Sequence, residues 1–414
     1  MRILLFGADV VNKGAETMIR TVQSEMGKRM VEPPSFFIVL PKYFKATEDQ
    51  IVSMGINVIE RQIPRKMFRN FDIILPIFYL PNLKKEIYKT KQLFWGWRKL
   101  MKNFDAVIDI GGYRYGEVWH LHHIMKSLPV VLYAWFQKKP YIFFPQAWGP
   151  FTKGTKIFNL CQWMCRKATL LFARDKESQK YLTELLDLSL DRINLVPDIG
   201  FRFHPSTDYE DEIEEILINK LRTKNIIGII PNMKVYERTE GKGKDNYYLN
   251  RLIKLSNYLI EEKGFSIILI PHNIDPKENA IDDRFLCDLI YENTAFPSKI
   301  HNIDTVVSAD YLKTFISKCE LIVTSRYHGA VASLELNKPT IIIGWSHKYI
   351  ELLKEVGLSE YVLDVTFEFD DLINKVEKAL NEKEEISKML KQRVLVLQEK
   401  VDGLFDLVSS FLNA

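Results

Sequence analysis

Four side chains that can bind or protonate an anion lie within residues 319–349: Arg326, His328, His347 and Lys348. An arginine guanidinium binds a carboxylate or phosphate through paired hydrogen bonds, and a histidine exchanges protons near neutral pH. Together these residue types predict a site for a small anion. The plainer alternative is that each makes a structural hydrogen bond, as a single arginine or histidine at a strand end usually does.

The surrounding pattern predicts two strands joined by a helix. The apolar run 321–323 is typical of a buried parallel strand, and residues 340–344 predict a second strand after Pro339. Small residues from Gly329 onward suit a helix that packs closely on a sheet. The two cationic pairs then follow the carboxyl ends of the strands. That edge of an α/β sheet is where ligands bind and where helix N-termini attract anions.

The N-terminal segment has the pattern of a strand, a glycine-containing loop and a helix. The apolar residues 1–7 precede Asn12, Gly14 and Glu16. The loop lacks the GxGxxG spacing, so a dinucleotide site is not predicted. The three residues either line an inter-domain cleft or form a helix cap with a carboxylate in the first turn, and their spacing does not separate these interpretations.

A second glycine-containing turn follows the apolar run 104–110. Gly111 and Gly112 permit a tight turn or a close approach of the backbone to a ligand. Asp109 and Glu117 flank the glycines and are candidates for acid–base catalysis on a hydroxyl group.

Three histidines follow this turn: His120, His122 and His123. They cannot all share one helix face, so a three-histidine metal site is not predicted. His120 is a candidate contact for a hydroxyl-bearing acceptor. The alternative is a partly exposed helix.

Further candidates lie at other strand ends. Arg174 follows the apolar run 170–173, and His272 follows residues 266–271. The polar, glycine-containing segment 234–246 has the composition of a mobile substrate loop. The repeated alternation of strands and helices predicts mostly parallel sheets.

Composition limits the class of protein. A chain of 414 residues is too long for one hydrophobic core and predicts two domains. The formal net charge of +4 does not indicate a nucleic-acid-binding protein. The four cysteines form no paired CxxC motifs, so neither a zinc site nor a disulfide framework is predicted. With no secretory signal pattern and no apolar run of ~20 residues, a cytoplasmic protein is expected.

Residues 61–102 differ in composition from the rest of the chain. They contain eleven Lys/Arg against two Asp/Glu, interleaved with aromatic residues. This combination predicts peripheral contact with an anionic membrane, on the inner face of the cell membrane for a cytoplasmic protein. Single-stranded nucleic acid uses the same pairing, but nothing else in the chain favours it. A solvated basic face with buried aromatic residues is the other alternative.

Taken together, these motifs resemble the polysaccharide pyruvyl transferase family over nearly the whole chain. The most specific part is the run 324–329, followed by Pro339 and Lys348 at the spacing of the family. Supporting motifs occur in the same order as in the family: Asn12-x-Gly14-x-Glu16, Asp109–Gly112, Gln146 with Gly149-Pro150, Ala173–Asp175 with Ser178, Pro197-Asp198 and Pro271-His272.

The resemblance implies a GT-B-like α/β fold, with two Rossmann-type domains of mostly parallel sheets facing a central cleft. It implies transfer of pyruvate from phosphoenolpyruvate to two hydroxyls of a sugar, forming a cyclic ketal, without a metal or other cofactor. Arg326 and His328 would then bind the donor and take part in catalysis.

The remaining roles are inferred from residue type. The expected donor site adds Arg174, Lys348 and His272, because phosphoenolpyruvate carries both a carboxylate and a phosphate. Asp109 or Glu117 is expected to accept a hydroxyl proton. The expected acceptor side comprises Asn12, Gly14, Glu16, Gly111, Gly112 and His120.

The expected domains are residues 1–205 on the acceptor side, 206–370 on the donor side, and a helical tail 371–414 that packs across both. The acceptor is expected to be a surface-polysaccharide sugar, with a polyprenyl-linked precursor as one form. Tyr113 stands where many relatives have a third glycine, and Trp345 where many have tyrosine. One alternative function is a glycosyltransferase of the same fold that uses a nucleotide sugar. The other is a non-enzymatic scaffold.

Overall fold

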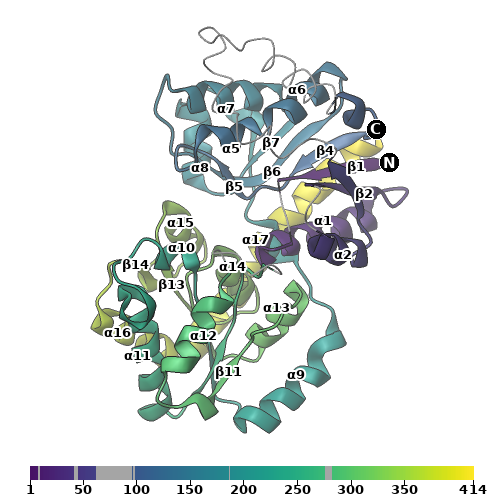
Figure 1. The fold of residues 1–414 in the computed structure, drawn as a ribbon. Helices are drawn as coiled ribbons and strands as arrows, with labels where there is room; N and C mark the ends of the chain where they lie inside the picture. The colour runs from purple at the N-terminus through teal and green to yellow at the C-terminus, as the bar shows by residue number, and fades with distance from the viewer. Residues whose placement is uncertain (8–9, 42–44, 62–95, 97, 186, 276–281) are drawn as a thin grey trace, which may run out of the picture. The chain divides into compact units, whose positions relative to one another are not determined.

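The computed structural model describes residues 1–7, 10–41, 45–61, 96, 98–185, 187–275 and 282–414 (Figure 1). Two compact units are present. The first comprises Met1–Val10, Val22–Asp198 and Gly403–Ala414, and the second comprises Val11–Thr21 and Ile199–Asp402. Neither unit is one continuous segment, and the sequence-based domain boundaries stay a prediction.

The first unit is built on a parallel sheet with the strand order β3-β2-β1-β4-β6-β7-β8, and β5 pairs with β6. Its strands are β1 (Arg2–Phe6), β2 (Ser35–Pro41), β3 (Asn57–Arg61), β4 (Ala106–Asp109), β5 (Tyr113–Tyr115), β6 (Tyr141–Trp148), β7 (Leu170–Ala173) and β8 (Ile193–Leu195). Every residue of β6 is buried, as expected for a central parallel strand.

One helix of the first unit shows clearly how apolar residues gather on one face. In α7 (Lys156–Lys167), Phe158, Cys161, Met164 and Cys165 are buried at the spacing of one helix face. The other helices described here are α2 (Lys45–Ser53), α5 (Leu121–Met125), α6 (Leu128–Phe136) and α8 (Lys176–Lys180). Helix α1 (Lys13–Arg29) contributes its residues from 22 onward, and α17 (Lys383–Asn413) its residues from 403 onward.

The second unit has a parallel sheet of order β11-β10-β9-β12-β13-β14, the strand order of a Rossmann fold. Its strands are β9 (Ile226–Ile230), β10 (Ser266–Leu269), β11 (Ile300–Asn302), β12 (Leu321–Thr324), β13 (Thr340–Gly344) and β14 (Val362–Asp364). Its helices are α9 (Glu210–Ile216), α10 (Met233–Tyr236), α11 (Tyr247–Glu261), α12 (Arg284–Asn293), α13 (Ala309–Ser317), α14 (Tyr327–Glu335), α15 (His347–Glu355) and α16 (Phe369–Asn381).

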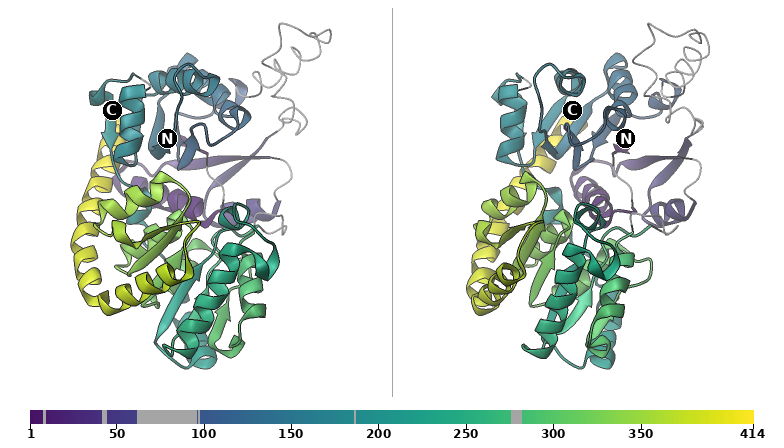
Figure 2. Two further views of the ribbon diagram at one scale, coloured as in Figure 1. Left: turned by 90° about the vertical axis from the view of Figure 1, so that its left-hand side faces the viewer. Right: turned by 60° about the vertical axis from the view of Figure 1, so that its left-hand side comes forward.

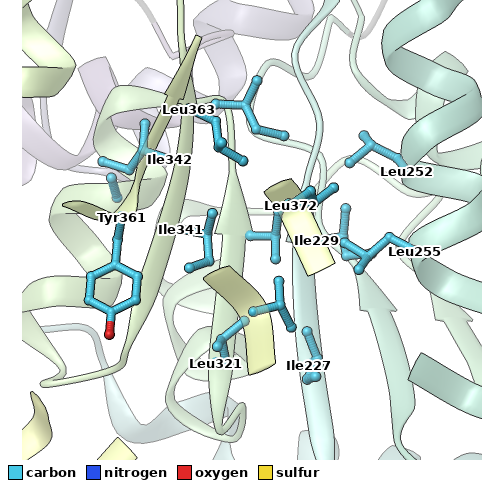
Figure 3. Close-up of a cluster of buried hydrophobic side chains, with 14 of the residues drawn as sticks. Ile227, Ile229, Leu252, Leu255, Leu321, Ile341, Ile342, Tyr361, Leu363 and Leu372 are labelled. Carbon is cyan, nitrogen blue, oxygen red and sulfur yellow. The ribbon is translucent and has the colours of Figure 1, made fainter. Parts of the chain in front are cut away.

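Both faces of this second sheet are covered by helices (Figure 2). Because successive strand residues point to opposite faces, Ile227 and Ile229 join one apolar cluster, while Ile226 and Ile230 join another. Figure 3 shows the first cluster, in which strand side chains meet Leu252 of α11 and residues from β14 and α16. This packing holds the strands in register and brings their carboxyl ends to one edge.

Candidate functional site

The carboxyl end of β12 is held by side chains from three other elements. Tyr248 donates a hydrogen bond to Ser325 Oγ at 2.9 Å. The carbonyl oxygen of Ser325 accepts from Asn232 Nδ2 at 2.7 Å and from the Tyr349 hydroxyl at 3.0 Å. Ser325 is buried, so these bonds fix the backbone from which Arg326 projects.

Asp283 connects this strand end to two others. Its side chain is fully buried and forms an ion pair with Arg326. The same carboxylate accepts backbone N–H bonds from Met233 at 3.1 Å and Asn273 at 2.8 Å, and a longer one from His272 at 3.3 Å. One carboxylate therefore links the segments that follow β9, β10 and β12.

Sequence reasoning missed Asp283. The residue directly precedes α12, where an aspartate usually caps the helix, but its side chain makes no capping bond there. Its partners come from distant parts of the chain, so no local pattern distinguishes it from an ordinary helix cap.

His328 packs directly against Gly14. A Cβ atom on Gly14 would lie 2.1 Å from Nδ1 and 2.2 Å from Cγ of His328. The amide of Gly14 donates to Asn12 Oδ1 at 3.0 Å, which starts helix α1. Asn12 and Gly14, expected on the acceptor side, therefore lie beside His328 in the second unit.

His272 lies in the same cluster. The backbone N–H of Lys13 donates to the His272 carbonyl at 2.9 Å. The adjacent residue Asn273 pairs with Asn12 in an isolated antiparallel β-bridge. Burial lowers the pKa of His272 well below 6.5, and the neighbouring basic groups of His328, Arg326 and Lys13 act in the same direction. His272 is consequently a neutral imidazole at physiological pH.

Lys13 is a further residue that sequence reasoning missed. Its side chain is 1% exposed, and its ammonium group pairs with Glu16 at 3.0 Å. Glu16 also accepts from Arg20 at 3.0 Å and from the backbone N–H of Ala309 at 3.1 Å. Glu16, predicted to contact the acceptor, thus holds a buried cation and the first turn of α13.

Lys348, the last predicted donor-site residue of this unit, lies among aromatic rings. Its ammonium nitrogen is 5.5 Å from the ring centre of Tyr327 and 5.1 Å from that of Tyr349. Since Tyr327 directly follows Arg326, the two predicted cations share one strand edge with His328 and His272. The four predicted residues, which are Arg326, His328, His272 and Lys348, therefore lie near one another within the second unit.

Asp109 of the first unit is fully buried. Its carboxylate accepts from Tyr115 at 2.5 Å, Tyr141 at 2.7 Å, Gln146 at 3.1 Å and the Gly111 amide at 3.0 Å. Burial raises the pKa of Asp109 against the opposing effects of Arg114 and of the hydrogen bonds from Tyr115, Tyr141 and Gly111. The arrangement favours holding the turn at Gly111 over direct contact with a substrate hydroxyl.

Glu117 also has structural partners. It accepts from Thr152 N at 2.9 Å, Thr152 Oγ1 at 2.7 Å and Thr155 Oγ1 at 2.6 Å. Burial acts to raise its pKa, but the hydrogen bonds from Thr155 and Thr152 outweigh burial, so the pKa is lowered. At neutral pH the carboxylate is ionised and secures the turn before α7.

The remaining predicted residues of the first unit, Arg174, Gly112 and His120, differ in burial and in the contacts they make. Arg174 forms a buried ion pair with Asp198 at 2.9 Å. Gly112 has φ of +67°, a backbone conformation that favours glycine. His120 is exposed at the start of α5, with its ring 5.7 Å from that of His122.

The predicted membrane-contact surface falls mainly on residues 62–95 and 97, which lie outside the described ranges. Within the described ranges, no helix is long and apolar enough to cross a membrane. The same part of the chain contains no group of three or more His, Cys, Asp or Glu side chains arranged to hold a metal ion.

Comparison with solved structures defines the fold class. UDP-GlcNAc 2-epimerase from Neisseria meningitidis bound to UDP-GlcNAc superposes with a TM-score of 0.58, at 14% identity and 94% coverage of both chains. Anabaena Alr3699/HepE in complex with UDP-glucose gives a TM-score of 0.58, at 10% identity, covering 99% of this chain and 98% of the other. The protein has a GT-B-like fold with two parallel-sheet domains, as predicted.

Sequence comparison defines the family. The family model "Polysaccharide pyruvyl transferase" matches residues 56–347. The amylovoran biosynthesis protein AmsJ of Erwinia amylovora is 23% identical over 308 residues, which cover 73% of this chain and 71% of that protein. The chain belongs to the polysaccharide pyruvyl transferase family, which confirms the resemblance found in the sequence.

Proposed function

We propose that the protein transfers pyruvate from phosphoenolpyruvate to a sugar diol and forms a cyclic ketal. The observation that carries this proposal is the cluster of Arg326, His328, His272 and Lys348 at one strand edge, in a chain of this family. Phosphoenolpyruvate presents two anionic groups close together, and such a ligand suits several cations beside a histidine.

The proposed reaction begins with a proton delivered to the methylene carbon of the donor. One sugar hydroxyl then forms a bond to the neighbouring carbon and loses its proton. The bond from that carbon to the phosphate oxygen breaks, and phosphate leaves. The second hydroxyl closes the ketal and loses its proton in turn. The methylene becomes a methyl group, and inorganic phosphate is the second product.

Each residue has a proposed role in this sequence. Arg326, oriented by Asp283, binds a carboxylate or phosphate of the donor, and Lys348 adds positive charge. His328 supplies the proton to the methylene carbon. The neutral imidazole of His272 is suited to accept a hydrogen bond beside it.

We infer that the acceptor is a sugar of a surface polysaccharide or of its lipid-linked precursor. Support comes from the family and from a relative whose name assigns it to amylovoran biosynthesis. The proposed setting is the cytoplasm, with peripheral contact at the inner face of the cell membrane.

The test is phosphate release from phosphoenolpyruvate by the full chain, with β-galactosides, mannosides and N-acetylhexosamines as acceptors. We expect acceptor-dependent release that falls about 100-fold or more in Arg326→Ala, because an oriented charge at the reacting group is lost. Arg222→Ala is the matched control, since Arg222 precedes the opposite end of β9.

Two outcomes would contradict the proposal. Equal release by Arg326→Ala and Arg222→Ala would exclude the assigned donor site. No release, with a rise in melting temperature caused by UDP or CMP compounds but not by phosphoenolpyruvate, would favour a nucleotide-sugar glycosyltransferase.

A further inference from the structure

Trp345, which follows β13, has two cations near its ring. The guanidinium carbon of Arg238 lies 4.2 Å from the ring centre, and the ammonium nitrogen of Lys348 lies 5.2 Å from it. The two charges are thus closer to each other than the ~10 Å over which 0.1 M salt screens them. An aromatic ring attracts each cation, but the cations repel one another.

Arg238 lies in residues 234–246, the segment expected from its composition to be a mobile substrate loop, and the backbone of this segment is hydrogen-bonded in the structure. This segment contains part of α10 and a short 3-10 helix at Gly243–Asp245. The Nδ2 atom of buried Asn246 lies 3.2 Å from each of four carbonyl oxygens that share its two N–H groups, those of Tyr236, Thr239, Glu240 and Gly241. Asn246 therefore links the backbone on both sides of Arg238.

Arg238 has no carboxylate partner among the residues that the structure describes. Its guanidinium donates to the carbonyl of Lys234 at 3.0 Å and stacks on Trp345. The neighbouring Glu237 is bound to the ammonium of Lys234 at 2.7 Å. Donor groups of an exposed guanidinium thus remain available beside a second cation.

We propose that Arg238, Trp345 and Lys348 form an anion subsite for the phosphate group of a small phosphorylated ligand. Both cations contact the ring of Trp345, and a phosphate group bound by them would offset their mutual repulsion. Arg238 becomes a ligand-binding residue on a segment that none of the predicted site residues occupies. The identification of the ligand as phosphoenolpyruvate rests on the proposed function, whereas the subsite itself requires only a phosphate group.

Calorimetric titration of the full chain with phosphoenolpyruvate, UDP and inorganic phosphate tests this subsite. In Arg238→Gln we expect Kd to rise about tenfold or more for the ligand that binds, because a charge-assisted pair of hydrogen bonds is lost. Arg222→Gln is the matched control with the same charge change, and its Kd should stay within about twofold of the unmodified protein.

A double-mutant cycle tests whether Arg238 acts from the tryptophan ring. Trp345→Leu should weaken binding, and Arg238→Gln should add little further loss in that background, because the guanidinium is no longer positioned. If the losses of binding free energy in Trp345→Leu and Arg238→Gln add fully in the double variant, the role given to Trp345 would be overturned. Melting curves of each variant establish that the chain is folded.

The outcomes separate this subsite from the proposed donor. Binding of phosphoenolpyruvate that is unchanged by Arg238→Gln would overturn the subsite and leave the proposed function standing. Binding of UDP alone, weakened by Arg238→Gln, would support the subsite and count against the proposed donor. Failure of all three ligands to bind at millimolar concentration would overturn the subsite.

Discussion

Gly14 shows how a single atom sets the position of a candidate catalytic group. A methyl group in Gly14→Ala would fall 2.1 Å from His328 Nδ1, so the imidazole or the start of α1 must move. We expect acceptor-dependent phosphate release to fall at least about tenfold, and stability to fall by about 1–3 kcal/mol.

Gly27→Ala is the matched control for this prediction, because Gly27 lies in the same helix and its Cβ would have nothing within 4 Å. That substitution should stabilise the protein by about 0.5–1 kcal/mol. Equal effects of the two substitutions on phosphate release would show that the contact with His328 is unimportant.

Asp283 orients Arg326, and this role is tested by removing the charge of the Asp283 carboxylate. In Asp283→Asn the ion pair with Arg326 is lost, and an amide replaces one oxygen that accepts backbone N–H groups. We expect the free energy of unfolding, measured in urea, to fall by about 3–5 kcal/mol, because the guanidinium of Arg326 loses its charged partner.

Asp406→Asn supplies the comparison for Asp283→Asn. Asp406 pairs with Arg29 at 2.7 Å but is 67% exposed, so its loss should cost less than ~1 kcal/mol. A similarly small loss for Asp283→Asn would contradict the assigned role.

At the scale of elements, the segment between α10 and α11 depends on one buried amide. The two N–H groups of the Asn246 side chain are shared among four carbonyls of that segment, and its Oδ1 also caps α11, accepting from Leu249 N at 3.1 Å. We expect Asn246→Ala to destabilise the protein by about 2–4 kcal/mol in urea unfolding, because α11 loses its cap and partly buried carbonyls lose a hydrogen-bond donor.

Asn250→Ala is the appropriate control, because Asn250 makes a single hydrogen bond to the Lys244 carbonyl from within α11. Its replacement should change stability by less than ~1 kcal/mol. The prediction for Asn246 fails if the two variants unfold at the same urea concentration.

At the scale of the whole molecule, buried neutral histidines make stability sensitive to acid. Burial lowers the pKa of His301 to about 4, with Lys220 acting in the same direction and Asp304 opposing. His301 also stacks on Phe315 at 5.1 Å. Below pH ~6.5 the histidine is protonated in the unfolded chain but stays neutral in the folded chain. The contribution of His301 to the free energy of unfolding is therefore full above pH ~6.5 and declines towards pH ~4.

Urea unfolding at pH 7 and pH 4.5 measures this effect. His301→Gln should reduce the loss of stability between the two values by about 1–2 kcal/mol, after allowance for partial solvent access. His272 contributes in the same direction and remains in both proteins. His120→Gln, a surface substitution of the same kind, is the control. An identical pH dependence for the two variants would contradict the assignment to His301.

The sequence alone determined the elements and the family. The apolar run 321–323 and the segment 340–344 predict buried parallel strands, because a strand buried on both faces has apolar side chains at successive positions. Arg326 and His328 follow one of these strands directly, so their place at the sheet edge was predictable. The GT-B-like fold and the family membership are both confirmed.

The tertiary structure alone decided which side chains meet. Asp283 reaches Arg326, and Gly14 makes room for His328, across long stretches of chain whose separation carries no periodic signal. Asp109 has the sequence context of a base at a strand end, yet Tyr115 and Tyr141 enclose it. Spacing along a chain fixes neighbours only within a helix or strand, whereas packing between elements selects partners by shape and charge.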